Sequence, residues 1–201
     1  HALRRRRDGR GLVALARASL TPHFLAARAD APFKNVPELI AYAKANPGKV
    51  TFASPGNGTA VHLAAEAFAD AAGIQLNHIP YRGTAPAVTA AVSGTVDLVL
   101  GAPGSIGPQV DSGKLRAIAQ FGPTRSPTLP NVPTLKENGV NVALRAEFGF
   151  FLPKGVPPDV VAKLDAALAK AIQSDDFKEF AARALAVPAY LPGPEYQKVV
   201  D

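Results

Sequence analysis

Hydrophobic residues between positions 33 and 121 change repeatedly from helical to strand spacing, and these changes predict alternating helices and strands. The segment NVPELIAYAKANPG predicts a helix that begins near Pro37 and ends at residues 46–48. KVTFAS then predicts a strand, and AVHLAAEAFADAAG predicts a second helix that ends at Gly73. In this second helix the expected inward residues are Val61, Leu63, Ala64, Phe68 and Ala71.

The same alternation continues through IQLNHI, a strand, APAVTAAVSG, a helix, and TVDLVL, a strand that is apolar at nearly every position. Further on, GKLRAIAQF and LRAEFGFFLP predict strands, and VPTLKENGV predicts a short helix that ends at Gly139. Residues 157–184 predict two helices separated near Ser174. Strands that alternate with helices are typical of a parallel sheet covered by helices, so we expect an α/β architecture.

The net charge of +6 is concentrated at the start of the chain. Residues 1–30 hold seven Arg and two Asp, which gives +5, whereas the remaining 171 residues hold 15 Lys or Arg and 14 Asp or Glu, which gives +1. HALRRRRDGRG contains neither a nucleic-acid reading element nor stacking aromatic residues, so nucleic-acid binding is not favoured. We expect residues 1–21 to be a basic leader that is disordered or non-native.

Targeting and redox signals are sparse. GLVALARASL is too short, and too interrupted by Arg17, to predict a signal-peptide core, and we expect the native N-terminus to be missing. No apolar run reaches about 18 residues, the length that a membrane span needs. The chain has no cysteine, which excludes disulfides, thiolate metal sites and cysteine nucleophiles.

Two glycine-containing loops, SPGNGT and YRGT, follow predicted strands and precede predicted helices. Ligands of open α/β sheets bind at these carboxyl ends, where free N–H groups and the positive end of the helix dipole form an anion site. Asn57, Thr59 and Thr84 either cap their helices or turn a donor to a ligand. Ordinary capped loops remain the alternative interpretation of both segments.

Catalytic and metal sites are weakly indicated. Ser54 and His62 could suggest nucleophilic catalysis, but no G-x-S-x-G motif is present, and a single helical histidine is more often a surface or capping residue. His23, His62 and His78 lack ligand-like spacing, so we expect no metal and no cofactor. Tyr81 and Arg82 either hold a ligand or are a packed tyrosine and a solvated arginine.

One long block, YRGTAPAVTAAVSGTVDLVLGAPGSIGPQVDSGKLRAIA, resembles the signature of the Bug-type solute-binding proteins, the periplasmic receptors of tripartite tricarboxylate transporters. Four other segments fit the same family in collinear order: NVPELIAYAKANPGKVTFASPGNGTAVHLAAEAF, HIPYRGTAPA, RSPTLPNVPTLKENG and FGFFLPKGVPPDVVAKL. The resemblance covers residues 33 to about 198 and fades before residue 33.

The resemblance implies a two-lobed periplasmic binding protein of type II, the Venus-flytrap architecture, whose cleft holds a small carboxylate. It also implies the ligand-binding residues, which are Ser54, Gly56, Asn57, Gly58 and Thr59 in one loop, Tyr81, Arg82, Gly83, Thr84 and Ala85 in the other, and Asp97. Asp97 matches the acidic position of G-x-V-D-L, where it either lies at the cleft floor or hinge or is a structural carboxylate that accepts backbone N–H bonds.

The resemblance further implies a second lobe at residues 22–143 and an incomplete, returning part of the first lobe at residues 144–201. It predicts a periplasmic receptor that delivers its ligand to membrane transporter subunits and is not an enzyme. An incomplete first lobe is expected either to self-associate or to bind its solute weakly, and the Arg-rich leader is expected to be frameshifted or vector-derived. The alternatives are a regulatory effector domain of the same fold and a small α/β hydrolase-like enzyme.

Overall fold

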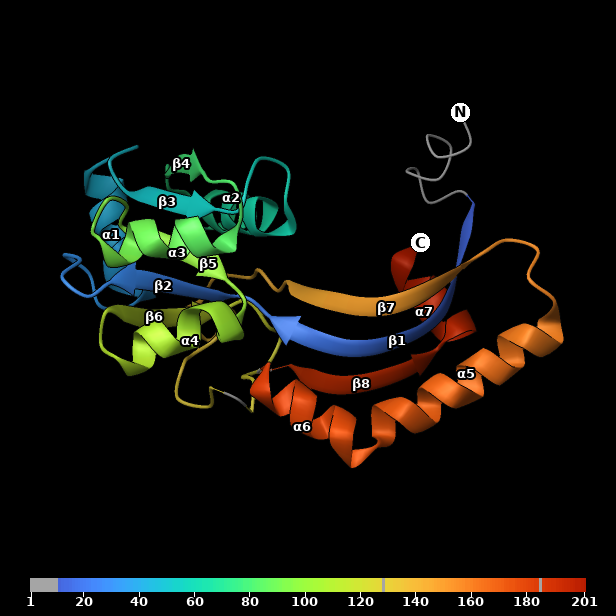
Figure 1. Cartoon of the computed structure of the whole chain (residues 1–201). Helices are drawn as coiled ribbons and strands as arrows, with labels where there is room; N and C mark the ends of the chain where they lie inside the picture. The colour runs from blue at the N-terminus through green and yellow to red at the C-terminus, as the bar shows by residue number, and fades with distance from the viewer. Residues whose placement is uncertain (1–10, 128, 185) are drawn as a thin grey trace. The chain divides into compact units, whose positions relative to one another are not determined.

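The computed structural model describes residues 11–127, 129–184 and 186–201. The chain separates into two compact units: one is Pro22–Ala146, and the other joins the residues before Pro22 to Glu147–Asp201. The corresponding expectation from the sequence was a division between residues 143 and 144. The elements of each unit are shown in Figure 1.

The unit Pro22–Ala146 alternates strands and helices along most of its length. Its elements are β2 (Phe24–Arg28), α1 (Val36–Ala45), β3 (Thr51–Ser54), α2 (Ala60–Ala72), β4 (Asn77–Pro80), α3 (Thr84–Val92), β5 (Leu98–Gly101), α4 (Pro103–Asp111), β6 (Leu115–Gln120) and the short 3₁₀ helix η2 (Lys136–Asn138). The five strands form one sheet in the order β4-β3-β5-β2-β6. β3 is parallel to β4 and β5, whereas β2 is antiparallel to both β5 and β6.

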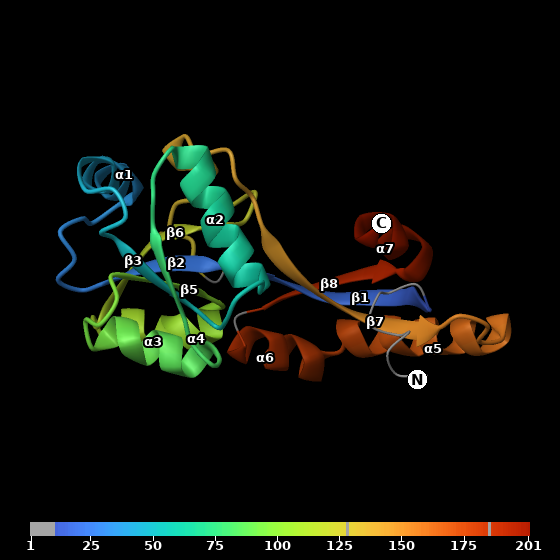
Figure 2. The same ribbon diagram turned by 90° about the horizontal axis from the view of Figure 1, so that it is seen from above.

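Helices cover both faces of this sheet, as Figure 2 shows. In β2, Leu25 and Ala27 face the core that contains α1 and α2, while Phe24 and Ala26 face the core that contains α3 and α4. The side chains of a strand alternate between faces, so a strand covered on both sides is apolar at successive positions. β5 shows the same arrangement, since all four of its residues are buried.

The predicted end of the second helix at Gly73 is confirmed, but its inward face differs in part from the prediction. Asn35 caps α1 and Thr59 caps α2 through their side chains, and Gly73 ends α2 in the left-handed conformation with φ 62°. Leu63 is 58% exposed. The buried residues of α2 are Val61, Ala64, Ala65, Phe68 and Ala69. This is the i, i+3, i+4, i+7, i+8 stripe, so placing Leu63 and Ala71 inward was wrong.

The second unit contains a three-stranded sheet and three helices. Its elements are β1 (Leu12–Pro22), β7 (Arg145–Pro153), α5 (Pro158–Gln173), α6 (Asp175–Arg183), β8 (Val187–Pro192) and α7 (Gly193–Val200), and its strand order is β7-β1-β8. β1 and β8 are antiparallel. The predicted separation of two helices near Ser174 is confirmed, because Ser174 accepts the backbone N–H of Phe177 and caps α6.

β1 corrects the expectation of a disordered leader for residues 12–21, which form a strand, while the expectation that the leader is non-native stays a prediction. Leu15 and Ala16 are buried, and Arg17 is accommodated by an ion pair with Glu147 at 3.2 Å and by a hydrogen bond to the Ala189 carbonyl. The expectation rested on the excess of arginine in this segment, but an arginine that is paired, as Arg17 is, is tolerated in a central strand. Residues 1–10 of the expected leader lie outside the described residues.

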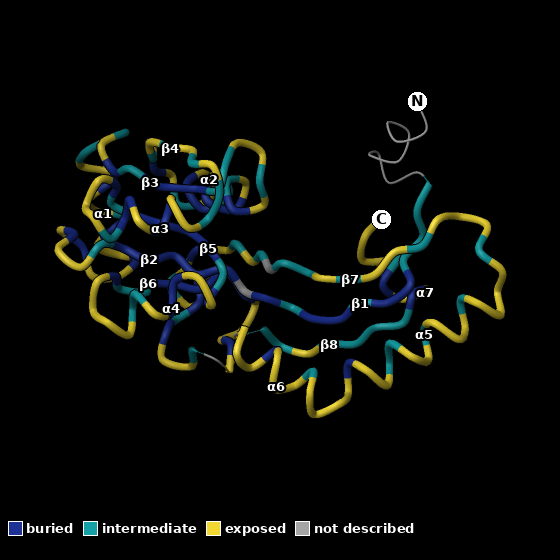
Figure 3. Tube along the Cα trace, viewed as in Figure 1, coloured by how far each residue is buried: buried dark blue, intermediate teal, exposed yellow. Residues whose placement is uncertain are grey.

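Burial differs between the two units, as Figure 3 shows. The strands β2 and β5 are largely buried, whereas α5 contributes only Ile172 as a buried residue and α6 only Ala181. The second unit also exposes several large apolar side chains, among them Phe148, Phe150 and Phe180. Within the described ranges, no helix is both long and apolar enough to cross a membrane.

Candidate functional site

The carboxyl ends of three neighbouring parallel strands form one edge of the sheet in the unit Pro22–Ala146. β3, β4 and β5 end there at Ser54, Pro80 and Gly101, and the helices α2, α3 and α4 begin a few residues later. The first N–H groups of a helix have no partner inside the helix, and the dipole adds positive potential at that end. This edge therefore collects three helix N-termini, which is an arrangement suited to anions.

The first loop, Pro55–Thr59, is shaped by two glycines at positive φ. Gly56 has φ 146° and Gly58 has φ 71°, conformations that residues with a side chain rarely adopt. Thr59 accepts the N–H of His62 and donates to the Gly56 carbonyl, so its side chain is engaged in capping. Asn57 lies exposed between the two glycines. The loop thus presents backbone, with the Asn57 side chain at its tip.

The second loop, Tyr81–Gly83, is held against the first by backbone hydrogen bonds. Tyr81 N–H donates to the Ser54 carbonyl at 2.9 Å, and Gly83 N–H donates to the Pro55 carbonyl at 3.2 Å. Gly83 is the N-cap residue of α3 with φ 114°. Thr84 therefore lies inside the first turn and is not the cap. Arg82 is exposed beside this turn.

The donors that face this edge are mainly backbone groups. In the described part of the chain, the N–H groups of Ala60 in α2 and of Thr84 and Ala85 in α3 make no hydrogen bond. The N–H group of Gly104, in the first turn of α4, likewise makes no hydrogen bond among the described residues. This third helix was not predicted from the sequence, although the strand TVDLVL followed by Gly-Ala-Pro could have indicated it, since proline favours a first helical turn.

Two histidines whose spacing in the sequence indicated no common site, His62 and His78, lie together beside the first loop. The rings of His62 in α2 and His78 in β4 stack with centroids 4.0 Å apart. His78 Nε2 lies 2.6 Å from Ser54 Oγ, and Gly58 N–H donates to His62 Nδ1 at 3.2 Å. His62 is therefore bonded to the candidate loop and is not an isolated surface histidine.

The contact between Ser54 and His78 has the composition of a nucleophile and its base, but its surroundings differ from those of a reactive pair. The Ser54 side chain is fully buried and also exchanges hydrogen bonds with the backbone of Gly56. Burial, and then the nearby His62, lower the pKa of His78, while Glu66 opposes this shift. A nucleophile must reach its substrate, so a buried Ser54 Oγ favours a structural role in shaping the loop.

Asp97 is not brought together with the other predicted site residues. It precedes β5, and its carboxylate accepts the backbone N–H and the hydroxyl of Thr51, both at 2.9 Å, and Arg28 Nε at 3.0 Å. Thr51 is the first residue of β3 and Ser54 the last. Asp97 therefore lies at the opposite end of the sheet from the loops, with the backbone-accepting role that was one of its two interpretations.

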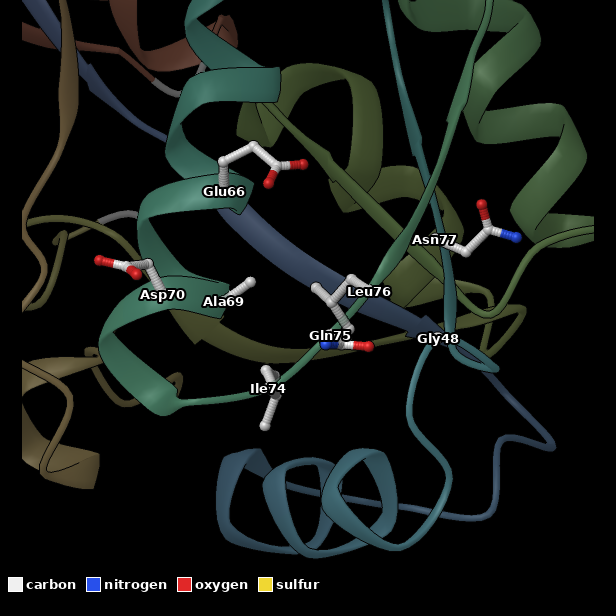
Figure 4. A pocket seen from close by; sticks show the side chains of 8 residues that line it. All are labelled: Gly48, Glu66, Ala69, Asp70, Ile74, Gln75, Leu76 and Asn77. Atoms are coloured by element: carbon white, nitrogen blue, oxygen red, sulfur yellow. The ribbon is translucent and has the colours of Figure 1, made fainter.

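A groove lies beside α2 and is lined in part by carboxylates, as Figure 4 shows. Its lining residues are Gly48, Glu66, Ala69, Asp70, Ile74, Gln75, Leu76 and Asn77. Two negative side chains disfavour an anion there. Among the described residues, no group of three or more His, Asp or Glu is placed to hold a metal ion. The three helix N-termini remain the better candidate for an anionic ligand.

Comparison with known proteins identifies relatives along nearly the whole chain. A model of the family described as "Tripartite tricarboxylate transporter family receptor" matches residues 4–200. This match extends well before residue 33, so the expectation that the resemblance fades there was wrong. A Cupriavidus necator protein, "UPF0065 protein in gbd 5'region", is 42% identical over 168 residues, which make up 84% of this chain and 51% of that protein.

Solved structures show the same relationship. "R. palustris Rpa4515 with adipate" is 25% identical with a TM-score of 0.85, and the match covers 94% of this chain and 64% of that chain. "MatC (Rpa3494) from Rhodopseudomonas palustris with bound malate" is 28% identical with a TM-score of 0.77, and the match covers 92% and 63% of the two chains. The chain spans about half the length of the curated relatives it matches.

Proposed function

Because the chain belongs to the tripartite tricarboxylate transporter receptor family, we propose that it is an extracytoplasmic receptor for a small carboxylate. The observation that carries this proposal is the convergence of three helix N-termini, with open backbone N–H groups, at one edge of the sheet. Carboxylates are stabilised by such groups without any buried cation. The solved relatives with adipate and malate support an aliphatic dicarboxylate as the ligand.

We assign the ligand contacts to the two predicted loops and to one further residue. The N–H groups of Asn57 and Thr59 in the first loop and of Thr84 and Ala85 at the start of α3 supply donors, and Gly104 adds a donor from α4. Tyr81 and Arg82 belong to the second loop, where the exposed Arg82 attracts the anion and contributes an exposed ion pair. Ser54 shapes the first loop from behind through its bonds to Gly56 and His78. Asp97 is assigned to the stability of the sheet.

The transport role follows from the family. The whole protein is proposed to close around its ligand as a periplasmic Venus flytrap and to deliver it to membrane transporter subunits, which recognise the closed form through differential affinity. No catalytic role is proposed for Ser54, because its hydroxyl is buried and fully engaged. The contact between Ser54 and His78 favours the competing interpretation, a small hydrolase. Turnover of a panel of small esters by the protein would support that interpretation.

Amide NMR of the isolated chain tests the proposal, because chemical shifts report even weak binding. Malate and adipate are expected to shift the amide signals of Gly56–Val61 and of Gly83–Ala85 in a saturable way. Malamide, which has the same carbon skeleton without carboxylates, is the matched control and should shift none of them. Saturable shifts confined to other parts of the chain, or equal effects of malate and malamide, would contradict a carboxylate site at this edge.

A further inference from the structure

The first ligand loop is bonded to His62, and the direction of that hydrogen bond assigns the tautomer of its ring. Gly58 N–H donates to His62 Nδ1, so Nδ1 carries a lone pair and no proton in this state. The proton of the neutral ring then resides on Nε2, which lies 3.5 Å from a carboxylate oxygen of Glu66. Nδ1 can accept the Gly58 N–H only while the ring is neutral, because both nitrogens of an imidazolium are donors.

The second histidine limits how much charge this cluster can hold. His78 stacks on His62 with ring centroids 4.0 Å apart and on Phe52 with centroids 4.6 Å apart. Two positive rings at such a separation repel each other, so one proton on the pair opposes the next. The bond between His78 and Ser54 survives in either charge state of His78, since a protonated Nε2 still donates to the hydroxyl.

We propose that His62 is a positioning residue that makes the anion affinity of the Pro55–Thr59 loop depend on pH. The proposal deepens the proposed function and rests on it. When His62 is neutral, its Nδ1 holds the Gly58 N–H and keeps that donor from a ligand. When His62 is protonated, the hydrogen bond is lost, the Gly58 N–H becomes available, and a positive ring lies behind the first turn of α2. Both changes favour a bound carboxylate.

The charged groups around His62 are few and act in opposite directions. Glu66, one turn further along α2, favours the protonated ring, and His78 on β4 opposes it when it carries charge itself. β3 contributes Phe52 and Ser54, which do not titrate in this range.

The effect expected on binding is moderate. One released hydrogen bond and one partly exposed charge together predict roughly three- to tenfold tighter malate binding at about pH 5.5 than at about pH 8. His62→Asn is the informative variant, because its side-chain oxygen can accept the Gly58 N–H in the place of Nδ1 and cannot be protonated. His78→Gln is the comparison, because it removes the other histidine and leaves His62 in place.

The test measures malate affinity at both pH values for the wild type and the two variants. Because the ionisation of malate changes with pH in the same way for all three proteins, comparing them removes its contribution. We expect the pH effect to remain in His78→Gln and to be reduced to that of malate alone in His62→Asn. In the ligand-free protein, the Gly58 amide signal should titrate together with the His62 ring signals.

The outcomes separate this inference from the proposed function. A wild type that binds malate at neither pH would refute the receptor assignment, while the ligand-free titration would still decide whether His62 controls the Gly58 amide. A Gly58 signal that stays constant while His62 titrates overturns the inference. So does a pH effect that persists in His62→Asn and disappears in His78→Gln.

Discussion

Replacement of Asp97 by Ala is expected to destabilise the unit Pro22–Ala146 without weakening ligand binding by the folded protein. The carboxylate accepts three hydrogen bonds, two from Thr51 and one from Arg28. The Thr51 hydroxyl in turn accepts the backbone N–H of Asp97 at 2.9 Å. The hydrogen bonds between Thr51 and Asp97 therefore join the start of β3 to the start of β5.

The size of the effect follows from these contacts. Each of the two lost hydrogen bonds from Thr51 costs about 1 kcal/mol, and the contact with Arg28, an ion pair whose two side chains are 23% exposed, adds up to about 1 kcal/mol. The free energy of unfolding should therefore fall by about 3 kcal/mol in Asp97→Ala. It should fall by about half as much in Asp97→Asn, which keeps one acceptor oxygen. Binding is spared because β3, at about 3.3 Å per residue, places Thr51 about 10 Å from Ser54.

Chemical denaturation followed by circular dichroism measures the stability, and amide NMR titration with malate measures the binding. Asp111→Ala, at the exposed C-terminal end of α4, is the matched control and should change stability by less than about 0.5 kcal/mol. The reasoning would be refuted by an Asp97→Ala protein of wild-type stability that no longer binds malate, since Asp97 would then act at the ligand site.

Three further outcomes are expected. Gly149→Ala should strongly destabilise the second unit, because a Cβ there would lie 2.2 Å from the Tyr196 ring, whereas Gly11→Ala, with open space around it, should be tolerated in the same denaturation assay. Burial lowers the pKa of His23, so the unfolded state binds more protons, and stability measured by denaturation should fall as pH drops below about 6.5; a rise on acidification would contradict this. Phe148, which is 57% exposed, should promote self-association, and Phe148→Ser should lower the apparent mass in sedimentation experiments.

The sequence predicted those elements whose signals are local. Asn35, Thr59 and Gly73 lie within one turn of the helix ends that they define, so the caps of α1 and α2 could be identified without knowledge of the fold. The strands KVTFAS and TVDLVL were likewise identified from short apolar segments and the turn residues around them. The α/β class followed from the order of these elements.

Other features depend on contacts between distant segments and were missed for that reason. β2 has only five residues, and both of its faces are buried, so it shows no alternation, and its antiparallel direction is set by pairing with β5 and β6. α4 contains Pro108 and two glycines, which argue against a helix locally. His62 and His78 meet only because the register of β3 and β4 places Phe52 opposite His78. No spacing in the sequence could indicate that contact.

The central claim is that backbone N–H groups, and not a side-chain cation, hold the carboxylate. Titration of malate into Arg82→Ala and Gly83→Val tests it most directly, with circular dichroism to establish that each variant is folded. Arg82→Ala should weaken binding by only about fivefold, the equivalent of about 1 kcal/mol for an exposed ion pair. Gly83→Val should abolish measurable binding, because Gly83 is the N-cap residue of α3 at φ 114°, which a β-branched residue rarely adopts. Loss of binding in Arg82→Ala together with normal binding by a folded Gly83→Val protein would contradict the account and identify a side-chain salt bridge.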